Sequence, residues 1–339
     1  MIVDRYYYQK LNPTEQVIYR TFYRGVMAHQ ELIPLPIRGT LSKESFGRIF
    51  NAMTRDNPLI YFLNQSACSC ARDLLGHTAI CPKYFFDKEK VKEYNRKIEG
   101  TVNQIVGDLK LLNCSTYEKE LRIHDWFCKN ISYDYEGSDR TKVVRAIASH
   151  NILGVFAYHK AQCEGIAKAV KVLLNAADEK CIVVCGEACK SKTTIPHAWN
   201  LVNIDGHPYH LDVTWDIGAK GKEIQRIPYD YFNLSDEWIG IEHCTDTLLP
   251  EAASMDQNYF LLNGILFHHS DEVFSFVETN LQKGATEFYI RYLGRKKMRE
   301  LVQELQRKIV KFYQKQGCSD KQIRSSVNEQ IRTCWIGIV

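Results

Sequence analysis

The strongest constraint on the fold is an alternating segment that surrounds Asp205 and Gly206. On either side of these two residues, residues 195–204 and 208–214 alternate in polarity. This alternation is typical of strands, and Asp-Gly is among the pairs preferred in the type I′ turn of a hairpin. The sequence therefore predicts an antiparallel β-hairpin that turns at Asp205 and Gly206.

The register of this hairpin would bring a histidine close to an aspartate. With the turn at those two residues, His197 pairs with Thr214 and Trp199 pairs with Asp212. Residues directly opposite share a face, and diagonal neighbours on that face lie within reach of each other, so His197 and Asp212 become neighbours. A single bulge would break this prediction, because one extra residue moves every later side chain to the other face.

A helix is predicted to begin at Cys163. Apolar residues recur after it at helical spacing: Ile166, Ala169, Val170, Leu173 and Leu174. The first N–H groups of a helix are unpaired and its dipole favours an anion there, which raises the thiolate fraction of a cysteine. Gln162 is not a usual N-cap residue, so the thiolate itself could meet those donors. Taken alone, Cys163 is better explained as a plain buried cysteine.

Together, Cys163, His197 and Asp212 are the parts of a cysteine acyl-transfer site. A thiol can attack a carbonyl carbon, an imidazole can take the thiol proton, and a carboxylate can fix the tautomer of that imidazole. Simpler explanations stay open on the residues alone. His197 could be a core histidine with a satisfied hydrogen bond, and Asp212 could be a turn or helix-cap residue.

Two other residues compete for these roles. Asp216 follows Asp212 by four positions and has the same face parity. His210 falls on the face of His197, where it could instead be a supporting partner. His207 lies in or beside the turn and is expected to be exposed.

Four further residues are expected to support the site or the fold. Trp199 shares the face of the histidine and would shield the pair from water, whereas Trp215 is predicted on the opposite face, in the core. Asn200 points away from the histidine and is expected to make a structural hydrogen bond. The Gln162 side chain is a candidate oxyanion donor, in addition to the Cys163 backbone N–H.

The runs AQCEGIAKA and PHAWNLVNIDGHPYHLDVTWD closely resemble the transglutaminase-like superfamily, particularly its bacterial members. The run YEKELRIHDWFCKNISYDY resembles the helical lead-in of that domain. The resemblance implies an α+β, papain-like fold in which a helix bearing the nucleophile packs against an antiparallel sheet. It assigns Cys163 as nucleophile, His197 as base and Asp212 as the residue that orients the base.

The resemblance also limits the chemistry. The superfamily includes protein cross-linking enzymes, peptidases, glycan amidases, deamidases and inactive members, and the active ones share a thioacyl intermediate. We therefore expect a cysteine enzyme that acts on protein or peptide amide bonds. Hydrolysis is favoured because the sequence marks no second site for an amine. A protein-glutamine transglutaminase or deamidase is the alternative, and a catalytically silent binding or scaffold module is an alternative of another class.

Three regions are predicted along the chain. Residues 1–100 form a mainly helical region, residues 101–240 the transglutaminase-like catalytic domain, and residues 255–339 an α+β and helical extension. No functional motif stands out in either flanking region.

Two local signals occur in the C-terminal extension. Asn263 and Gly264 separate two short apolar runs and predict a second hairpin. Ser319 with Gln322 has the spacing of a capping box and predicts a final short helix.

Composition excludes several other classes of protein. The chain carries 44 basic and 40 acidic residues without an extended basic patch, so no nucleic-acid partner is expected. It has no apolar run long enough to span a membrane and no signal peptide, and its twelve cysteines favour free thiols in the cytoplasm. Cys68, Cys70 and Cys81 fit no zinc spacing, and carboxylates are not clustered for calcium, so no cofactor and no metal is expected. The oligomeric state is not predicted.

Overall fold

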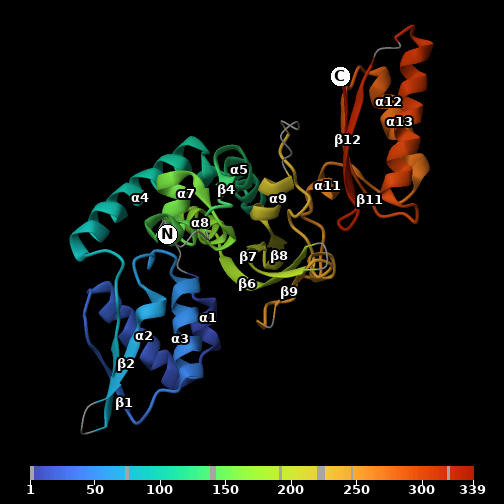
Figure 1. Cartoon of the computed structure of the whole chain (residues 1–339). Coiled ribbons are helices and arrows are strands. Elements are labelled where there is room, and N and C mark those ends of the chain that lie inside the picture. The colour runs from blue at the N-terminus through green and yellow to red at the C-terminus, as the bar shows by residue number, and fades with distance from the viewer. Residues whose placement is uncertain are drawn as a thin grey trace.

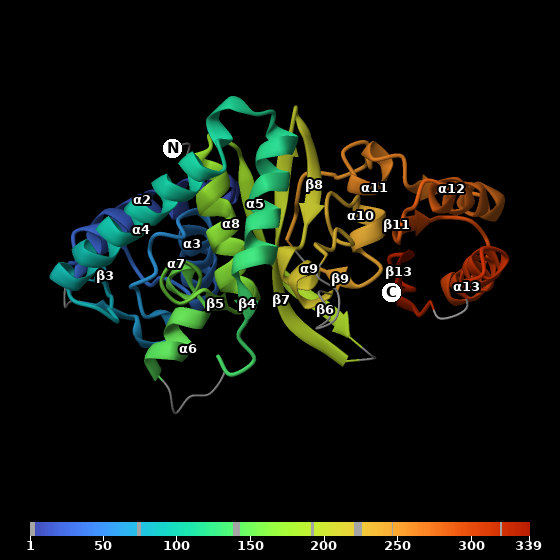
Figure 2. The same cartoon turned by 90° about the horizontal axis from the view of Figure 1, so that it is seen from above.

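The computed structural model describes residues 4–72, 76–137, 143–190, 193–219, 226–245, 247–318 and 321–339. The N-terminal helices and the C-terminal sheet lie at opposite ends of the molecule, with a layer of helices and a sheet between them (Figures 1 and 2). Among the residues described, no helix is both long enough and apolar enough to cross a membrane.

The N-terminal region combines helices with a small antiparallel sheet of order β1-β3-β2. Its elements are α1 (Tyr6–Lys10), α2 (Pro13–Met27), β1 (Ile33–Arg38), α3 (Lys43–Asp56), a 3-10 turn (Gln65–Ala67), β2 (Ser69–Arg72) and β3 (His77–Cys81). Helix α4 (Lys88–Asp108) then leads into the centre of the molecule, so the boundary predicted at residue 100 falls inside a helix. The division of the chain into three regions stays a prediction.

The central region holds the predicted helix and hairpin. Its elements are a 3-10 turn (Leu111–Asn113), α5 (Thr116–Asn130), β4 (Ser132–Tyr133), α6 (Val143–Ser149), α7 (Ile152–Tyr158), β5 (Lys160–Ala161), α8 (Cys163–Ala176), β6 (Cys181–Lys190), β7 (Thr193–Ile204), β8 (His207–Leu211), α9 (Val213–Ala219), α10 (Asp236–Ile239) and β9 (His243–Cys244). Strands β8-β7-β6-β9 form one antiparallel sheet in that order.

The hairpin has the predicted turn but a shorter second strand. Asp205 and Gly206 both have positive φ, as a type I′ turn requires, and the ladder from Ile204 to Asn200 follows the predicted register. Strand β8 ends at Leu211, however, and the chain turns into α9 immediately afterwards. The predicted pairing of His197 with Thr214 is therefore wrong, because Thr214 lies in a helix.

Helix α8 packs against one face of the central sheet. Ala167 of α8 forms a small apolar cluster with Val183 and Ala198 of the sheet, and Asn200 donates a hydrogen bond to the Ala167 carbonyl at 2.9 Å. Since most of the helix is buried, it is fixed along its length, and so is Cys163 at its start. The predicted α+β fold is confirmed, with a helix that begins at Cys163 and lies on an antiparallel sheet.

The C-terminal region forms a separate sheet with its own apolar core (Figure 1). Its elements are α11 (Tyr259–Leu262), β10 (Leu266–Phe267), α12 (Ser270–Gln282), β11 (Glu287–Tyr292), α13 (Met298–Lys315), β12 (Ile323–Asn328) and β13 (Thr333–Ile338), with strand order β10-β11-β13-β12.

Two predictions in this region are wrong. Asn263 and Gly264 do not form a hairpin turn, because they follow helix α11 and the next strand pairs in parallel with β11. The predicted final helix is replaced by the antiparallel strands β12 and β13. Ser319, its predicted cap, lies outside the described residues.

Candidate active site

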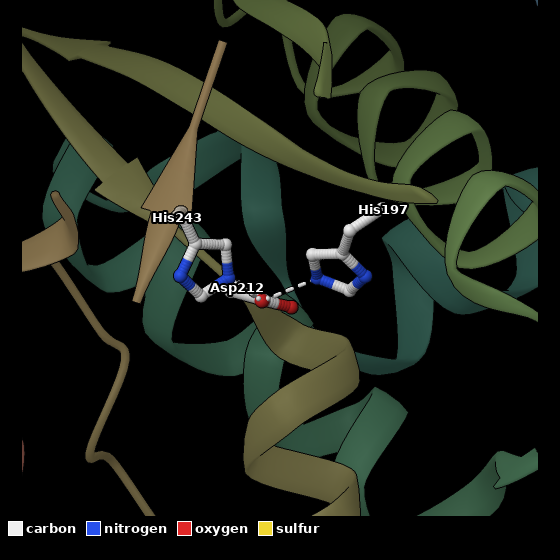
Figure 3. Close-up of side chains that lie close together, drawn as sticks. All are labelled: His197, Asp212 and His243. Carbon is white, nitrogen blue, oxygen red and sulfur yellow. Dashed lines mark hydrogen bonds and ion pairs between the residues drawn. The ribbon is translucent and has the colours of Figure 1, made fainter. Parts of the chain in front are cut away.

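His197 and Asp212 are in direct contact at the end of the central hairpin (Figure 3). His197 lies on β7 and is 6% exposed, and Asp212 is fully buried between β8 and α9. The Nε2 atom of His197 lies 2.7 Å from Oδ2 of Asp212. The proximity predicted from the hairpin is therefore observed, although Asp212 follows the strand instead of continuing it.

Cys163 is the third residue of this arrangement. It is the first residue of α8 and is partly exposed, and it lies close enough to the His197 ring to raise the pKa of that ring. Because Nε2 of His197 faces Asp212, Nδ1 is the nitrogen left for the thiol. His197 thus lies between a thiol and a carboxylate.

The electrostatics favour a charged imidazole between these two groups. Burial lowers the pKa of His197, but the charge and hydrogen bond of Asp212, together with Cys163, outweigh it and raise the pKa to about 10. Burial likewise raises the pKa of Asp212, yet His197 and His243 more than offset it and hold that pKa well below its ordinary value. Asp212 therefore stays ionised and stabilises a proton on His197.

Asp212 is also the cap of helix α9. Its Oδ1 atom accepts a hydrogen bond from the Trp215 backbone N–H at 3.1 Å, and its own N–H donates to the Tyr231 carbonyl at 3.0 Å. The cap explains why the strand ends at Leu211. It also corrects the prediction for Trp215, whose ring is not in the core on the opposite face but lies 5.8 Å from the ring of His197.

The two competing residues have partners of their own. Asp216, on α9, contacts Nε2 of His124 through Oδ2 at 3.0 Å and joins that helix to α5. His210 accepts a hydrogen bond from the Trp199 indole at 3.0 Å, and its other ring nitrogen lies 2.8 Å from Asp236. Neither residue is hydrogen-bonded to His197.

The supporting residues occupy three different environments. Trp199 is buried and stacks on His197 with ring centroids 6.1 Å apart. Asn200 is buried on the other side of the strand, where it holds α8 by its bond to Ala167. The Gln162 side chain donates to the Asp134 carbonyl at 3.2 Å, which fixes that side chain directly before the cysteine.

His243 is the third member of this cluster and was not predicted from the sequence (Figure 3). It comes from the two-residue strand β9 and is buried, and its Nε2 lies 2.8 Å from the same Oδ2 of Asp212 that contacts His197. A strand of two residues has no periodic pattern, so no sequence signal could have found it.

A cleft of about 630 Å³ opens beside His197. Its walls include the aromatic rings of three tyrosines and a tryptophan, and both β7 and the turn between β12 and β13 contribute to them. The lining residues are Tyr133, Tyr135, Ile195, Pro196, His197, Thr214, Trp215, Gly218, Ala219, Tyr231, Glu242, Asn328 and Gln330. Tyr133 lies close enough to Cys163 for that thiol to affect the pKa of its phenol, which burial raises to about 12. The cleft therefore reaches the imidazole, and one of its lining residues, Tyr133, lies near the thiol.

His197, Asp212 and His243 are also the kinds of residue that bind zinc. Their potential ligand atoms lie within 4.8 Å of one another, and no other such group occurs among the residues described. The two imidazole nitrogens lie 2.7 and 2.8 Å from the same carboxylate oxygen, whereas two ligand atoms on one tetrahedral zinc, each about 2.1 Å from the metal, would stand roughly 3.4 Å apart. In this arrangement the contacts are hydrogen bonds.

Part of the chain is similar in sequence to known proteins. Residues 104–213 match the family model of the transglutaminase-like superfamily. A stretch of 154 residues is 26% identical to the kyphoscoliosis peptidase of Mus musculus and covers 43% of this chain. The match spans 23% of that relative, so this chain corresponds to about a quarter of its length.

Two solved structures are also similar. The crystal structure of a TGase superposes with a TM-score of 0.30 at 14% identity, covering 54% of this chain and 51% of that one. A candidate cysteine protease from Cytophaga hutchinsonii superposes with a TM-score of 0.28 at 12% identity, covering 43% of this chain and 61% of that one.

The family match includes the candidate site. A helix that starts with a cysteine packs against a sheet bearing a histidine, and the matched segment contains that cysteine, the histidine and Asp212. Residues 104–213 are thus similar to the transglutaminase-like superfamily.

Proposed function

We propose that this protein is a cysteine enzyme that cleaves amide bonds of proteins or peptides through a thioacyl intermediate. The observation that carries the proposal is the position of His197, whose ring contacts Asp212 at 2.7 Å and lies close enough to Cys163 for that thiol to raise the pKa of the ring. A histidine held in this way can move a proton between a thiol and a leaving group while the carboxylate keeps its ring oriented. A histidine with only a structural role needs no contact with a partly exposed thiol.

The reaction proceeds in two steps. The Cys163 sulfur attacks the carbonyl carbon of the amide as His197 holds the thiol proton, and the C–N bond then breaks as His197 gives that proton to the leaving amine. A water molecule next attacks the thioester and loses a proton to His197. The C–S bond breaks, the carboxylic acid leaves, and the proton returns to the Cys163 sulfur.

The developing negative charge on the carbonyl oxygen needs hydrogen-bond donors. The Cys163 backbone N–H at the start of α8 is one, because the first N–H groups of a helix have no partner within it. The Tyr133 phenol is a second candidate, since it lies on the cleft wall close to the thiol. The Gln162 amide is a weaker choice because it already donates to Asp134.

The substrate class is supported by the cleft beside His197. Its volume of about 630 Å³ and its aromatic walls suit the side chains of an extended peptide. Hydrolysis is preferred over transfer to an amine, because the sequence marks no second site for an amine. A glutamine transglutaminase or a deamidase remains the alternative.

Labelling with a thiol reagent tests the nucleophile. We expect iodoacetamide to modify Cys163 faster than the other eleven cysteines, and this selectivity to disappear in His197→Ala. His207→Ala is the matched control, because His207 is exposed at the far end of the same hairpin and should leave the rate unchanged. If Cys163 reacts no faster than exposed Cys189, the protein is a binding or scaffold module instead.

Mass spectrometry of candidate protein substrates then identifies the reaction. Chain cleavage supports a peptidase. A mass increase of about one dalton without cleavage marks a deamidase, and incorporation of an added amine marks a transglutaminase. The Cys163→Ala variant is the control, because each of these changes requires the thiol.

A further inference from the structure

His243 is a buried histidine that contacts Asp212 and that the proposed reaction does not use. Its Nε2 lies 2.8 Å from Oδ2 of Asp212, the oxygen that His197 contacts at 2.7 Å. The side chains of both His243 and Asp212 are fully buried, so neither has water to replace the other. The carboxylate therefore meets two imidazoles on one oxygen and the Trp215 N–H on the other.

Backbone pairing and hydrogen bonds on both sides of His243 hold its main chain in place. Strand β9 pairs with β6 through Glu187 and Ala188. Immediately before β9, the Glu242 carbonyl accepts a hydrogen bond from Cys189 at 2.7 Å, and immediately after it Thr245 donates to the Cys185 carbonyl at 2.8 Å. This short strand is thus fixed on both sides of the histidine.

A glycine allows β9 to come this close. A Cβ atom on Gly186 would collide with the Cys244 carbonyl oxygen. In the ladder Gly186 also faces His197 across the β6–β7 pair. Gly186 therefore makes room for the strand that carries His243 and is also the ladder partner of the proposed base, His197.

Aromatic rings fix the orientation of the His243 ring. The ring centroid of Trp215 lies 4.6 Å away, that of Trp199 5.1 Å away and that of Tyr231 6.0 Å away. The Nδ1 atom is buried without a hydrogen-bond partner among the residues described. An unpaired buried N–H is costly, so the contacts assign the proton of His243 to Nε2, where it points at Asp212.

We propose that His243 is a positioning residue that holds Asp212 for His197. Its Nε2–H fixes Oδ2 where the His197 ring needs it, so that the other nitrogen of that ring stays aimed at Cys163. The inference rests on the proposed function, because the orientation matters only if His197 serves the thiol. His243 itself touches neither the thiol nor the cleft.

Two substitutions separate the hydrogen bond from packing. His243→Phe keeps an aromatic ring among the tryptophans but removes the donor. His243→Gln is the matched variant, because the glutamine amide nitrogen occupies nearly the position of the histidine Nε2 and can still donate to Asp212. We expect His243→Phe to slow the alkylation of Cys163 about tenfold, the size of one lost hydrogen bond to a charged group, and His243→Gln to recover most of the rate.

Two results of the labelling experiment would overturn the inference. A fall of less than about threefold in His243→Phe would overturn the inference. So would a rate in His243→Gln as low as in His243→Phe, because packing and not the donor would then be responsible. Thermal melting of both variants shows whether each is folded.

Nitrogen-15 NMR of the histidine rings gives a test that is independent of the thiol. We expect His243, assigned by the signals lost in His243→Phe or His243→Gln, to carry a proton on Nε2. A bare Nε2 in the wild-type protein would overturn the inference, since it could not donate to Asp212. If Cys163 proves unreactive in the wild type, the proposed function fails, whereas this measurement still decides whether His243 holds Asp212.

Discussion

Replacing Asp212 with asparagine tests how much the carboxylate contributes to the proposed base. Asp212 accepts hydrogen bonds on both oxygens, from two imidazoles and from the Trp215 N–H. An asparagine has only one acceptor oxygen, so its NH₂ group must face either the imidazoles or the backbone N–H. If it faces His197, the proton of that ring moves to the nitrogen that meets Cys163.

The size of the effect follows from the pKa of His197. Its pKa of about 10, against an ordinary 6.5, corresponds to about 5 kcal/mol in favour of the charged ring. Asp212 and Cys163 are the causes that raise it. If Asp212 supplies about half, Asp212→Asn costs the charged His197 ring roughly 2–3 kcal/mol, which corresponds to about a 50-fold effect.

The assay is the rate of Cys163 alkylation by iodoacetamide near neutral pH, followed by mass spectrometry. Exposed Cys189 in the same sample is the internal control and should react equally in both proteins. We also expect Asp212→Asn to have no further effect in a His197→Ala background, because the carboxylate acts through the histidine. A rate for Asp212→Asn within about threefold of the wild type would refute this reasoning.

Two further predictions concern stability and the approach of β9. Burial raises the pKa of Glu120 to about 8, against an ordinary 4.5. Between these two values the folded protein holds a proton that the unfolded chain releases. The free energy of unfolding should therefore fall by up to about 5 kcal/mol as pH rises from about 4.5 to 8. Glu120→Gln should remove this part of the pH dependence in urea unfolding, and an unchanged slope would contradict it. Gly186→Ala should push the Cys244 carbonyl away, lower stability by about 1–3 kcal/mol and slow Cys163 labelling as His243→Phe does. A Gly186→Ala protein with wild-type melting and labelling would show that the close approach of β9 is not required.

Local signals in the sequence predicted the parts of the site that depend on neighbouring residues. The Asp205-Gly206 pair adopts the expected positive φ values, and the helix begins at Cys163 as its apolar spacing indicates. Capping boxes occur at Asn12 and Ser115 for the same reason. Each of these features is decided within a few residues, where propensity and hydrogen bonding act without help from the rest of the fold.

The errors arose where one residue satisfied two patterns. The alternation of residues 208–214 continues through Asp212, but that side chain accepts the Trp215 N–H and starts a helix. Asn263 and Gly264 likewise read as a hairpin turn, whereas Gly264, with positive φ, follows the last turn of α11 and ends that helix. A cap and a turn use the same residue types, so tertiary contacts decide between them.

The placement of Asp212 depends on contacts that lie far away in the sequence. Asp216, which competes with it on sequence alone, contacts His124 and so ties α9 to α5, 92 residues earlier in the chain. Because Asp212 caps that same helix, the contact that occupies Asp216 also fixes the direction in which Asp212 points. His243 then holds Asp212 from the other side, 31 residues later. The rival carboxylate is thus part of the support of the site, and a sequence can reveal the residues of such a site while leaving their support to the folded chain.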